Sequence, residues 1–328
     1  MIWVTQQAAQ TKKDLLMKRA QVLRCLRKFF EERDFLELST PLLVKNPGLE
    51  PYLRIFKTRF EPDMGGGKAE NFYLPTSPEY HLKKALGRWG FERVFEVSRS
   101  FRNGERSSLH EPEFSMLEWY RSPGSYQEIA QDFEELMKVL GKTFAPQDAW
   151  DKVRHLTVNE AYQKYAGVDL EGALSGKAKS LAEQAGEASE DFETCFHRLM
   201  VSKVEPKLGQ QGPEFLWDYP ATLSALARLK PGTSLWCERF EVYWKGIELA
   251  NAFGELIDPQ EQRRRCEADR LKRLELYGES PDIDDEFLTC LGQIKHPSGG
   301  IAVGLDRFIQ CLLGAKNVQD VVAFPHAI

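Results

Sequence analysis

The chain is poor in the features that mark secreted, zinc-binding and membrane proteins. Its cysteines, at positions 25, 195, 237, 266, 290 and 311, include no Cys-x-x-Cys pair. This spacing argues against a zinc site or a disulfide framework and is typical of reduced cytosolic thiols. No apolar run approaches the ~20 residues that a membrane-spanning helix needs. The N-terminal residues also lack the apolar stretch of a signal peptide. We therefore expect a cytoplasmic protein.

A surplus of basic residues is missing as well. Lys and Arg total 44 against 49 Asp and Glu, a formal net charge of −5. Dedicated nucleic-acid-binding domains usually carry a positive surplus, so this balance argues against such a role but allows a local basic patch. Hydrophobic residues make up 42% of the 328 positions, which suffices for one large α/β or α+β domain or two smaller ones.

Two segments resemble motifs only superficially, and no internal repeat is visible. Gly65-Gly66-Gly67-Lys68 lacks the spacing of a phosphate-binding loop, so a flexible hairpin tip is the favoured interpretation. The Arg263-Arg264-Arg265 run is more typical of a solvated helix face than of a nucleic-acid contact.

Periodicity and capping residues predict several elements. Leu15–Arg33 has the apolar stripe of an amphipathic helix, and it leads into a short strand that is stopped by Pro41. Proline cannot donate to a sheet ladder, so this strand is expected at an edge or interface. Helices are predicted to begin after the capping residues Ser125 and Asp258. Residues 150–212 are helical and charged in pattern, which predicts an inserted helical subdomain.

The segment Phe101–Tyr120 carries the densest chemical information. A strand over Val94–Phe101 ends at Arg102, a polar loop follows, and a second strand begins after Pro112. Strand side chains alternate, so one face of the second strand carries Phe114, Met116, Glu118 and Tyr120. An aromatic ring can stack on a base, and the guanidinium fork can hold a phosphate. The alternative is an ordinary β-hairpin with one core face.

A second hairpin is predicted over Trp236–Phe253, and its informative part is Arg239–Leu249. If Lys245 and Gly246 form its turn, Tyr243 pairs with Glu248 and Glu241 pairs with Ala250. The carboxylates of Glu241 and Glu248 then lie on one face, ~7–8 Å apart between backbones. Two such hard oxygen ligands can hold Mg²⁺ shared with substrate phosphates. The alternative is a solvated hairpin with scattered acids.

A third element is the glycine-bordered strand Ser298–Gly304, which runs directly into a helix that continues through Leu313. Glycines let a ligand approach the backbone closely, and a helix N-terminus favours negative charge. Arg307 in the first turn can stack on a base from the side opposite Phe114.

Together these segments resemble a known family. Thr40-Pro41, Phe101–Tyr120 and Gly304-Leu305-Asp306-Arg307 resemble motifs 1, 2 and 3 of the class II aminoacyl-tRNA synthetases, over about Leu15 to Pro325. Thr76–Glu79 and Glu248–Glu255 are similar to the lysine-specific branch. The resemblance implies an α+β fold with an antiparallel sheet flanked by helices, one catalytic domain over residues 1–328, and a homodimer interface at motif 1.

Only some fourteen residues precede the first predicted helix, so no anticodon-binding domain is expected. In this respect, and in Arg239–Asn251, the chain resembles stand-alone paralogues of the lysyl synthetase catalytic domain. These paralogues ligate (R)-β-lysine to elongation factor P. Ala302 occupies a position that is glycine in the lysyl synthetases, and its methyl group is expected to disfavour α-lysine.

The resemblance also implies contacts for ATP, Mg²⁺ and the lysine-type substrate. The residues implied for ATP are Arg102, Asn103, His110, Phe114, Glu248, Leu249, Gly304 and Arg307. Those implied for the substrate are Ser77, Glu79, Tyr120, Asn251, Phe253, Glu255 and Ala302. Glu241 and Glu248 are implied for Mg²⁺. Among these, Arg102 is expected at the α-phosphate, and Tyr120 and Glu255 at the distal ammonium. No covalent nucleophile is expected.

Three residues depart from the family pattern. Gly104 replaces a glutamate of the motif 2 loop, Glu111 stands where asparagine is usual, and Ala252 replaces a glycine. The two loop departures affect positions that could contact ATP or the acceptor.

The function predicted from these residues is ATP-dependent activation of (R)-β-lysine as an adenylate and its transfer to a lysine side chain of elongation factor P. One alternative is a non-catalytic paralogue that senses lysine or a nucleotide. Another is a truncated lysyl-tRNA synthetase that charges tRNA, which the acidic balance disfavours.

Overall fold

The structure is a computed structural model that describes residues 6–62, 67–148, 150–186 and 191–326. The chain forms two compact units. The first comprises Met1–Gly124, Ile257–Ser298 and Ala302–Ile328, and the second comprises Ser125–Leu256 and Gly299–Ile301. Within the described ranges, no helix combines the length and the apolar character needed to cross a bilayer.

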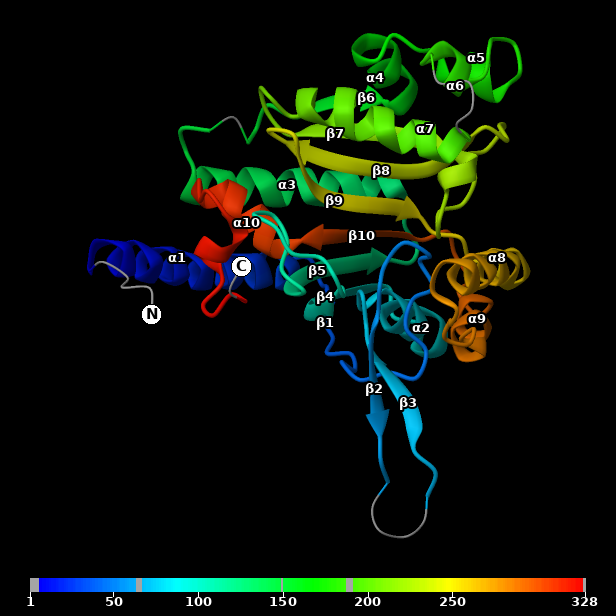
Figure 1. Cartoon of the computed structure of the whole chain (residues 1–328). Helices are drawn as coiled ribbons and strands as arrows, with labels where there is room; N and C mark the ends of the chain where they lie inside the picture. Colours follow the sequence, from blue (N-terminus) through cyan, green and yellow to red (C-terminus); the bar gives the residue numbers. More distant parts are fainter. Residues whose placement is uncertain (1–5, 63–66, 149, 187–190, 327–328) are drawn as a thin grey trace. The chain divides into compact units, whose positions relative to one another are not determined.

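The first unit combines a sheet with flanking helices (Figure 1). Its helices are α1 (Gln6–Glu31), α2 (Glu79–Trp89), α8 (Pro259–Tyr277), α9 (Asp285–Leu291), α10 (Leu305–Leu313) and the 3-10 turn η4 (Val318–Val321). Its sheet strands are β1 (Leu36–Glu37), β4 (Arg93–Phe101), β5 (Glu113–Arg121) and the end of β10 (Gly299–Gly304), in the order β1-β4-β5-β10. β4 and β5 pair antiparallel, and β1 pairs with β4 in parallel at the edge predicted for it.

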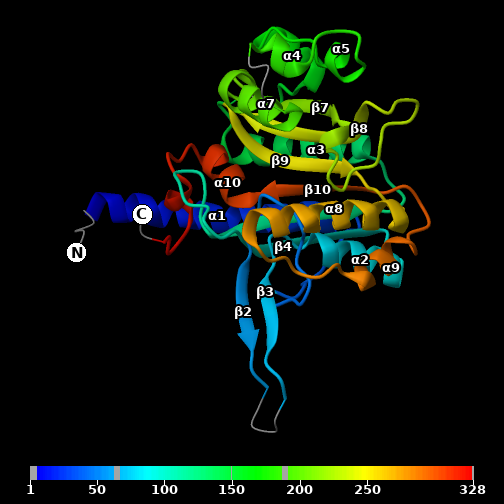
Figure 2. The same cartoon turned by 45° about the vertical axis from the view of Figure 1, so that its right-hand side comes forward.

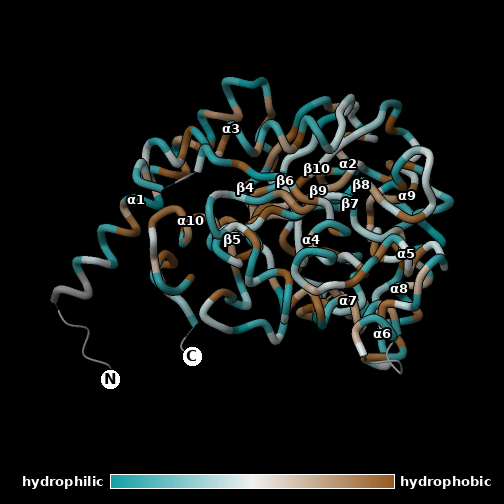
Figure 3. The backbone as a smooth tube through the Cα atoms, turned by 90° about the horizontal axis from the view of Figure 1, so that it is seen from above, coloured by the Kyte–Doolittle hydropathy of each residue, from teal (hydrophilic) through white to brown (hydrophobic). Residues whose placement is uncertain are grey.

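Helix α1 confirms the amphipathic pattern and begins earlier than predicted, at Gln6. Its tube alternates between hydrophilic and hydrophobic colours in Figure 3. The apolar side chains are buried against the sheet, because the Phe30 ring stacks on Phe95 of β4 at 4.6 Å and lies 5.1 Å from Trp119 of β5. The helix thereby supports β4, which leads into Arg102, and β5, which carries Phe114.

Strands β2 (Phe56–Phe60) and β3 (Glu70–Leu74) form a separate antiparallel hairpin of the first unit. In Figures 1 and 2 this hairpin extends away from β4. The hairpin predicted around Gly65–Lys68 is present, but positions 65 and 66 of its tip lie outside the described residues.

The second unit is also a sheet with helices packed on it. Its strands follow the order β10-β9-β8-β7-β6, with β6 (Arg154–Thr157), β7 (Glu214–Pro220), β8 (Trp236–Trp244) and β9 (Ile247–Gly254). Its helices are α3 (Tyr126–Phe144), α4 (Val158–Tyr165), α5 (Leu170–Leu174), α6 (Leu181–Gln184) and α7 (Phe192–Leu199), followed by the turns η1 (Met200–Val204), η2 (Glu205–Lys207) and η3 (Ala221–Leu223). Helix α3 packs on β8 and β9, and α4 contacts β7.

The range 150–212 is largely helical, but it also contains a strand that the sequence pattern did not reveal. β6 pairs in parallel with β7. Leu156 of β6 packs on a buried cluster that includes Tyr162 and Phe196. A strand of four residues is too short to show clear alternation of apolar and polar side chains, and the residues around β6 have a helical pattern.

The hairpin formed by β8 and β9 has the predicted turn. Lys245 and Gly246 both adopt positive φ angles, of 52° and 76°, as a two-residue turn of this kind requires. Trp244 pairs with Ile247 and Tyr243 pairs with Glu248, which confirms the register next to the turn.

Further from the turn the predicted register is wrong. Glu241 pairs with Asn251 and not with Ala250, because the register shifts next to Tyr243 and β9 gains one residue. Tyr243 shares a face with Glu241 and lies opposite Glu248, so the two carboxylates still belong to one face. The shift also brings Asn251 onto that face.

Candidate functional site

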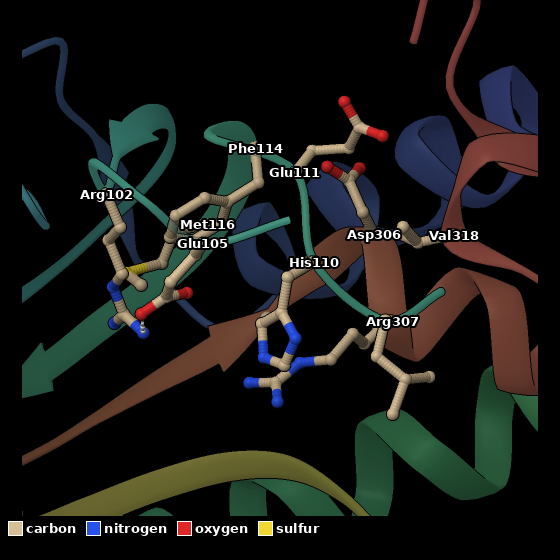
Figure 4. Close-up of a pocket in the computed structure, with 11 residues that line it drawn as sticks. Arg102, Glu105, His110, Glu111, Phe114, Met116, Asp306, Arg307 and Val318 are labelled. Carbon is tan, nitrogen blue, oxygen red and sulfur yellow. Dashed lines mark ion pairs between the residues drawn. The ribbon is translucent and has the colours of Figure 1, made fainter. Parts of the chain in front are cut away.

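A pocket of the first unit lies where β4 and β10 end and β5 begins (Figure 4). It brings together five of the residues predicted to contact ATP: Arg102, His110, Phe114, Gly304 and Arg307. Asn103 is not part of this lining. The predicted ATP contacts Glu248 and Leu249 belong to the second unit.

Arg102 and Phe114 contact each other in this pocket. The guanidinium carbon of Arg102 lies 5.2 Å from the centroid of the Phe114 ring, within the range of a cation–π interaction. Its Nη1 lies 3.8 Å from Oε1 of Glu105, as the dashed line in Figure 4 marks. The buried Nε has no hydrogen-bond partner among the described residues. A guanidinium with a spare buried donor is well suited to an anionic oxygen.

Arg307 lies against the end of β10. A β-carbon at Gly304 would stand 2.9 Å from Nε of Arg307, so any larger residue there would require the guanidinium to shift. Arg307 also affects the pKa of His110. Burial lowers the pKa of His110, and the positive charges of Arg307 and Arg102 lower it further, in opposition to Glu105. His110 is therefore a neutral hydrogen-bonding group at physiological pH, and its Nδ1 lies 2.9 Å from Oγ of Ser107.

Asp306, which also lines the pocket, joins three elements. Its Oδ1 lies 2.6 Å from Nη1 of Arg19 in α1, and its Oδ2 accepts a hydrogen bond of 2.7 Å from the backbone N–H of Ser115 in β5. Arg19 also donates to Oγ of Ser115 at 2.8 Å. Ser115 is the sequence neighbour of Phe114 on β5, and Asp306 is the sequence neighbour of Arg307 on α10. The network therefore fixes the backbone at the two positions that carry the Phe114 ring and the Arg307 guanidinium.

The structure gives a local role to Glu111, one of the departures from the family pattern. Its Oε1 accepts from Nε2 of Gln319 at 2.7 Å, and its Oε2 accepts from the backbone N–H of His326 at 3.0 Å. Burial raises the pKa of Glu111, but these hydrogen bonds outweigh it and leave the pKa below its usual value. Glu111 thus anchors the segment that follows α10.

The first of the predicted substrate contacts lie at the start of α2. Oγ of Ser77 accepts a hydrogen bond of 3.3 Å from the backbone N–H of Glu79. The carboxylate of Glu79 pairs at 2.5 Å with Nζ of Lys83, one turn further along the helix. Lys83 is only 1% exposed, so this is a buried ammonium held by a carboxylate. The sequence analysis did not identify Lys83, although the i, i+4 spacing could have indicated the pair.

Tyr120 is bound to a carboxylate on its own strand. Its hydroxyl donates to Oε2 of Glu118 at 2.9 Å, and Glu118 is fully buried. Burial raises the pKa of Glu118 well above its usual value, and the nearby carboxylate of Glu79 raises it further. Oε1 of Glu118 has no hydrogen-bond partner among the described residues. Glu118 lies on the predicted face but was not predicted as a site residue. Ala302 is half-buried in β10.

In the second unit Arg239 organises the face that carries Glu241. Its Nη2 lies 2.7 Å from Oε1 of Glu241, its Nε donates to Oδ1 of Asn251 at 3.2 Å, and its Nη1 donates to the carbonyl of Leu223 at 2.7 Å. Its guanidinium carbon lies 5.8 Å from the Phe253 ring. Arg239 was part of the predicted hairpin but received no role. A charged residue in the middle of a buried strand was the available signal.

Two tyrosines bind the other oxygen of Glu241. The hydroxyl of Tyr243 donates to Oε2 at 2.6 Å, and the hydroxyl of Tyr219 donates to the same oxygen. Burial raises the pKa of both tyrosines well above the usual value, and the charge of Glu241 raises it further. Both hydroxyls therefore stay protonated and act as donors. Glu255, predicted to bind an ammonium, is 1% exposed and forms an isolated bridge with Ala227.

The carboxylates predicted for Mg²⁺ suit a cation that is shared with a ligand. Among the described residues there is no cluster of three or more His, Cys, Asp or Glu side chains suitable for a metal. Glu241 already accepts three hydrogen bonds, and a carboxylate offers about four acceptor positions. Glu241 can therefore supply one oxygen, and Glu248 on the same face can supply another. Mg²⁺ commonly takes one or two carboxylates and completes its shell with substrate phosphates and water.

Comparison with known families identifies the family to which this fold belongs. Residues 3–328 match the family model of class II tRNA synthetases (D, K and N). The chain belongs to the class II tRNA synthetase family, and the antiparallel strand pairs β4–β5 and β8–β9 confirm the predicted fold class. The outer strands β1 and β6 add parallel pairs to it.

Curated relatives cover nearly the whole chain. A protein of Erwinia tasmaniensis named elongation factor P–(R)-β-lysine ligase is 37% identical over 316 residues, 94% of each chain. Proteins of the same name from Vibrio atlanticus and Vibrio vulnificus are 36% and 35% identical, over 98% and 95% of this chain and 98% and 96% of their own. The resemblance stated from the motifs is thus confirmed.

Proposed function

We propose that this protein is an ATP-dependent ligase that activates (R)-β-lysine and transfers it to a lysine side chain of elongation factor P. The names of the relatives support this assignment, since they cover at least 94% of this chain at 35–37% identity. The observation on the protein itself that carries the proposal is the pocket of Arg102, Phe114 and Arg307. The pocket combines an aromatic ring that can stack on a base with two guanidinium groups. One of these can bind a phosphate, and the other can cover the opposite face of the base.

In this proposal ATP binds in the pocket of the first unit. The Phe114 ring stacks on adenine, and Arg307 covers the opposite face of the base. Arg102 moves from its contact with Phe114 and Glu105 to the α-phosphate, where its spare Nε–H donor is used. His110 is uncharged and supplies a hydrogen bond without adding repulsion between cations. Asn103, Glu248, Leu249 and Gly304 complete the proposed ATP contacts.

The lysine-type substrate carries two ammonium groups, and its proposed contacts are mostly carboxylates and other hydrogen-bond acceptors. Ser77 and Glu79 receive the amino-acid head, and Tyr120 and Glu255 receive the distal ammonium. Asn251 and Phe253 line the substrate, and Ala302 limits the space beside it. A buried ammonium needs carboxylate partners because its desolvation is otherwise prohibitive. Glu255 is buried, as such a partner must be.

The proposed chemistry has two displacements. A carboxylate oxygen of the substrate attacks the α-phosphorus of ATP, the bond from that phosphorus to the β-phosphate oxygen breaks, and pyrophosphate leaves. The ε-amine of the acceptor lysine then attacks the adenylate carbonyl, loses a proton and expels AMP. Mg²⁺ held by Glu241 and Glu248 supplies charge neutralisation on the phosphates when it is bound. Arg102 and Arg307 do the same from the protein, so positioning and electrostatics carry the catalysis.

Assembly and location are further parts of the proposal. Leu36, Leu42 and Leu43, which flank Thr40-Pro41, are 40–46% exposed. An exposed apolar segment at motif 1 supports a homodimer interface there, which sedimentation analysis tests. We assign the activity to the cytoplasm, where ATP and translation factors are present, and we treat the chain as one catalytic domain with an insertion at 150–212.

The experiment that tests the proposal is ATP–pyrophosphate exchange with Mg²⁺, in which (R)-β-lysine is compared with α-lysine. Exchange that depends on (R)-β-lysine is expected. Preference for α-lysine would favour the truncated tRNA-charging enzyme, and binding without exchange would favour a non-catalytic sensor. Replacement of Ala302 by glycine is expected to raise the rate with α-lysine about tenfold relative to (R)-β-lysine, the effect of roughly one methyl group.

A variant of the ammonium site separates substrate binding from nucleotide binding. Glu255→Gln removes one negative charge from a buried position. In the exchange assay, this variant is expected to lower the apparent affinity for the lysine-type substrate far more than the apparent affinity for ATP. Equal losses for both substrates would contradict the assigned role.

A further inference from the structure

The first unit contains a second cavity whose lining is separate from that of the pocket around Phe114. Its volume is about 200 Å³, and it is lined by residues of β2, β3 and α8, of the segment before β2, and of the segments that follow β4 and α8. Three of these residues are cations: Arg54, Lys57 and Arg273. The rings of Tyr73 and Tyr277 form part of the wall.

Arg54 and Arg273 both contact the ring of Tyr277, and Arg273 is also held by backbone carbonyls. The guanidinium carbons of Arg54 and Arg273 lie 5.6 and 5.3 Å from the centroid of Tyr277. Arg273 is 5% exposed, and its Nη1 donates to the carbonyls of Glu50 and Leu53, both at 2.8 Å. Its buried Nε has no hydrogen-bond partner among the described residues. The cavity therefore has a fixed guanidinium with a donor to spare.

The charge of the lining is strongly positive. Glu279 is the carboxylate among the described lining residues, and it pairs with Lys57 at 2.6 Å. Three cations face one anion, so the cavity favours a ligand with more than one negative charge. Guanidinium forks bind phosphate oxygens with two parallel hydrogen bonds, and a tetrahedral oxyanion can accept from several donors at once. The volume is ample for one or two phosphate groups.

The backbone connects this cavity to the ATP pocket. Asn103 lines the cavity, and its N–H donates to the carbonyl of Arg54 at 2.9 Å. The preceding residue, Arg102, lines the pocket with Phe114. We infer that the cavity of Arg54, Lys57 and Arg273 is a binding site for a phosphate-class anion, and that its ligand is the pyrophosphate released beside Arg102. The source of the anion rests on the proposed function, whereas the anion site itself does not.

The experiment is calorimetric titration of the full-length protein with sodium pyrophosphate, inorganic phosphate and AMP, without a lysine substrate. Arg54→Gln and Lys57→Gln each remove one cation of the cavity and keep the side chain polar. Arg59→Gln removes another exposed cation from β2, the strand of Lys57, outside the lining, and is the matched control. Arg102→Gln tests the first pocket. Thermal unfolding of each variant checks that it is folded.

The inference predicts that Arg54→Gln and Lys57→Gln each weaken pyrophosphate binding about tenfold, the effect of a charge-assisted hydrogen bond. Arg59→Gln is expected to leave it within twofold, and Arg54→Gln is expected to leave AMP binding unchanged. Pyrophosphate binding that is lost only in Arg102→Gln would overturn the inference, because the anion would then occupy the first pocket alone. A loss of AMP binding in Arg54→Gln would also overturn it, since the cavity would then belong to the nucleotide site.

The two proposals fail in different ways. If the wild type shows no ATP–pyrophosphate exchange but Arg54→Gln weakens pyrophosphate binding about tenfold, the anion site stands and the proposed reaction does not. If exchange proceeds and pyrophosphate binding is insensitive to Arg54 and Lys57, the reaction stands and the anion site does not.

Discussion

Arg239 and Glu241 lie two residues apart on β8 and are joined by an ion pair of 2.7 Å between Nη2 and Oε1. The side chains are 17% and 10% exposed, so the pair is largely removed from water. Burial acts to lower the pKa of Arg239, but the electrostatic interactions with Glu241, Tyr219 and Cys237 and the hydrogen bond with Glu241 together outweigh it and leave the pKa raised. The pair holds the Glu241 carboxylate in a fixed orientation on the face that also carries Glu248.

Replacement of Arg239 by methionine should destabilise the protein. The variant keeps the volume of the side chain but leaves the Glu241 carboxylate without its cation and Asn251 without its donor. Breaking one partner of a buried pair costs several kcal/mol, and partial exposure reduces this to about 2–4 kcal/mol. Urea unfolding measures the difference. Arg27→Met, which removes a half-exposed pair with Glu37, is the matched control and should change stability by less than about 1 kcal/mol. Equal effects of the two variants would contradict the account.

Glu118 should make stability depend on pH. Its pKa is raised in the folded state by burial and then by Glu79, so the folded protein favours the neutral carboxyl. This contribution is fully present below the usual glutamate pKa of 4.5 and is lost as the pH rises toward the folded-state pKa. Glu118→Gln retains an acceptor for Tyr120 and does not ionise. The thermal midpoint of Glu118→Gln, relative to that of the wild type, should therefore rise as the pH is raised from 5 to 8. Glu113→Gln, at a half-exposed position, serves as the control. A constant difference across that range would show that Glu118 does not titrate as described.

Phe114 should contribute to nucleotide affinity more than to stability. Base–aromatic stacking is worth about 1–3 kcal/mol, so Phe114→Ala should weaken ATP binding about tenfold in calorimetric titration. The side chain is half-buried at the pocket, and the thermal midpoint should fall only slightly. Phe60→Ala, an exposed aromatic on β2, is the control and should leave ATP affinity unchanged. Unaltered ATP affinity in Phe114→Ala would remove the stacking role.

Glu111 should secure the C-terminal segment. Its hydrogen bonds with Gln319 and His326 are lost in Glu111→Ala, so tryptic cleavage after Lys316 should become faster at neutral pH. The pKa of Glu111 is lowered in the folded state despite its burial, so the contribution is present above 4.5 and is lost as the pH falls through the folded-state value. Glu32→Ala, at an exposed position directly after α1, should not alter the cleavage. ATP affinity should fall less than in Phe114→Ala, and a larger loss would indicate a direct role in nucleotide binding.

The sequence predicted the elements whose signals are local. Strand alternation placed Phe114 and Tyr120 on one face, and the capping residues Ser125 and Asp258 lie at the starts of α3 and α8 as expected. The Lys245-Gly246 turn was predicted correctly because both residues tolerate a positive φ in a two-residue hairpin.

The contacts that the sequence did not reveal depend on residues far apart or on a bulge. Glu111 and His326 are separated by 215 positions, and no local pattern connects them. The shift that pairs Glu241 with Asn251 arises from one additional residue in β9, which alternation alone cannot place. Glu118 was on the predicted face, but its burial with Tyr120 depends on the packing of the first unit.

The most direct test of the account is the intact mass of elongation factor P after incubation with this protein, ATP, Mg²⁺ and (R)-β-lysine. The account predicts one added β-lysyl group on a lysine of the acceptor, which is absent without ATP and strongly reduced with Arg102→Gln. An unchanged acceptor mass, under conditions in which the wild type catalyses ATP–pyrophosphate exchange, would contradict the assignment of elongation factor P as the acceptor.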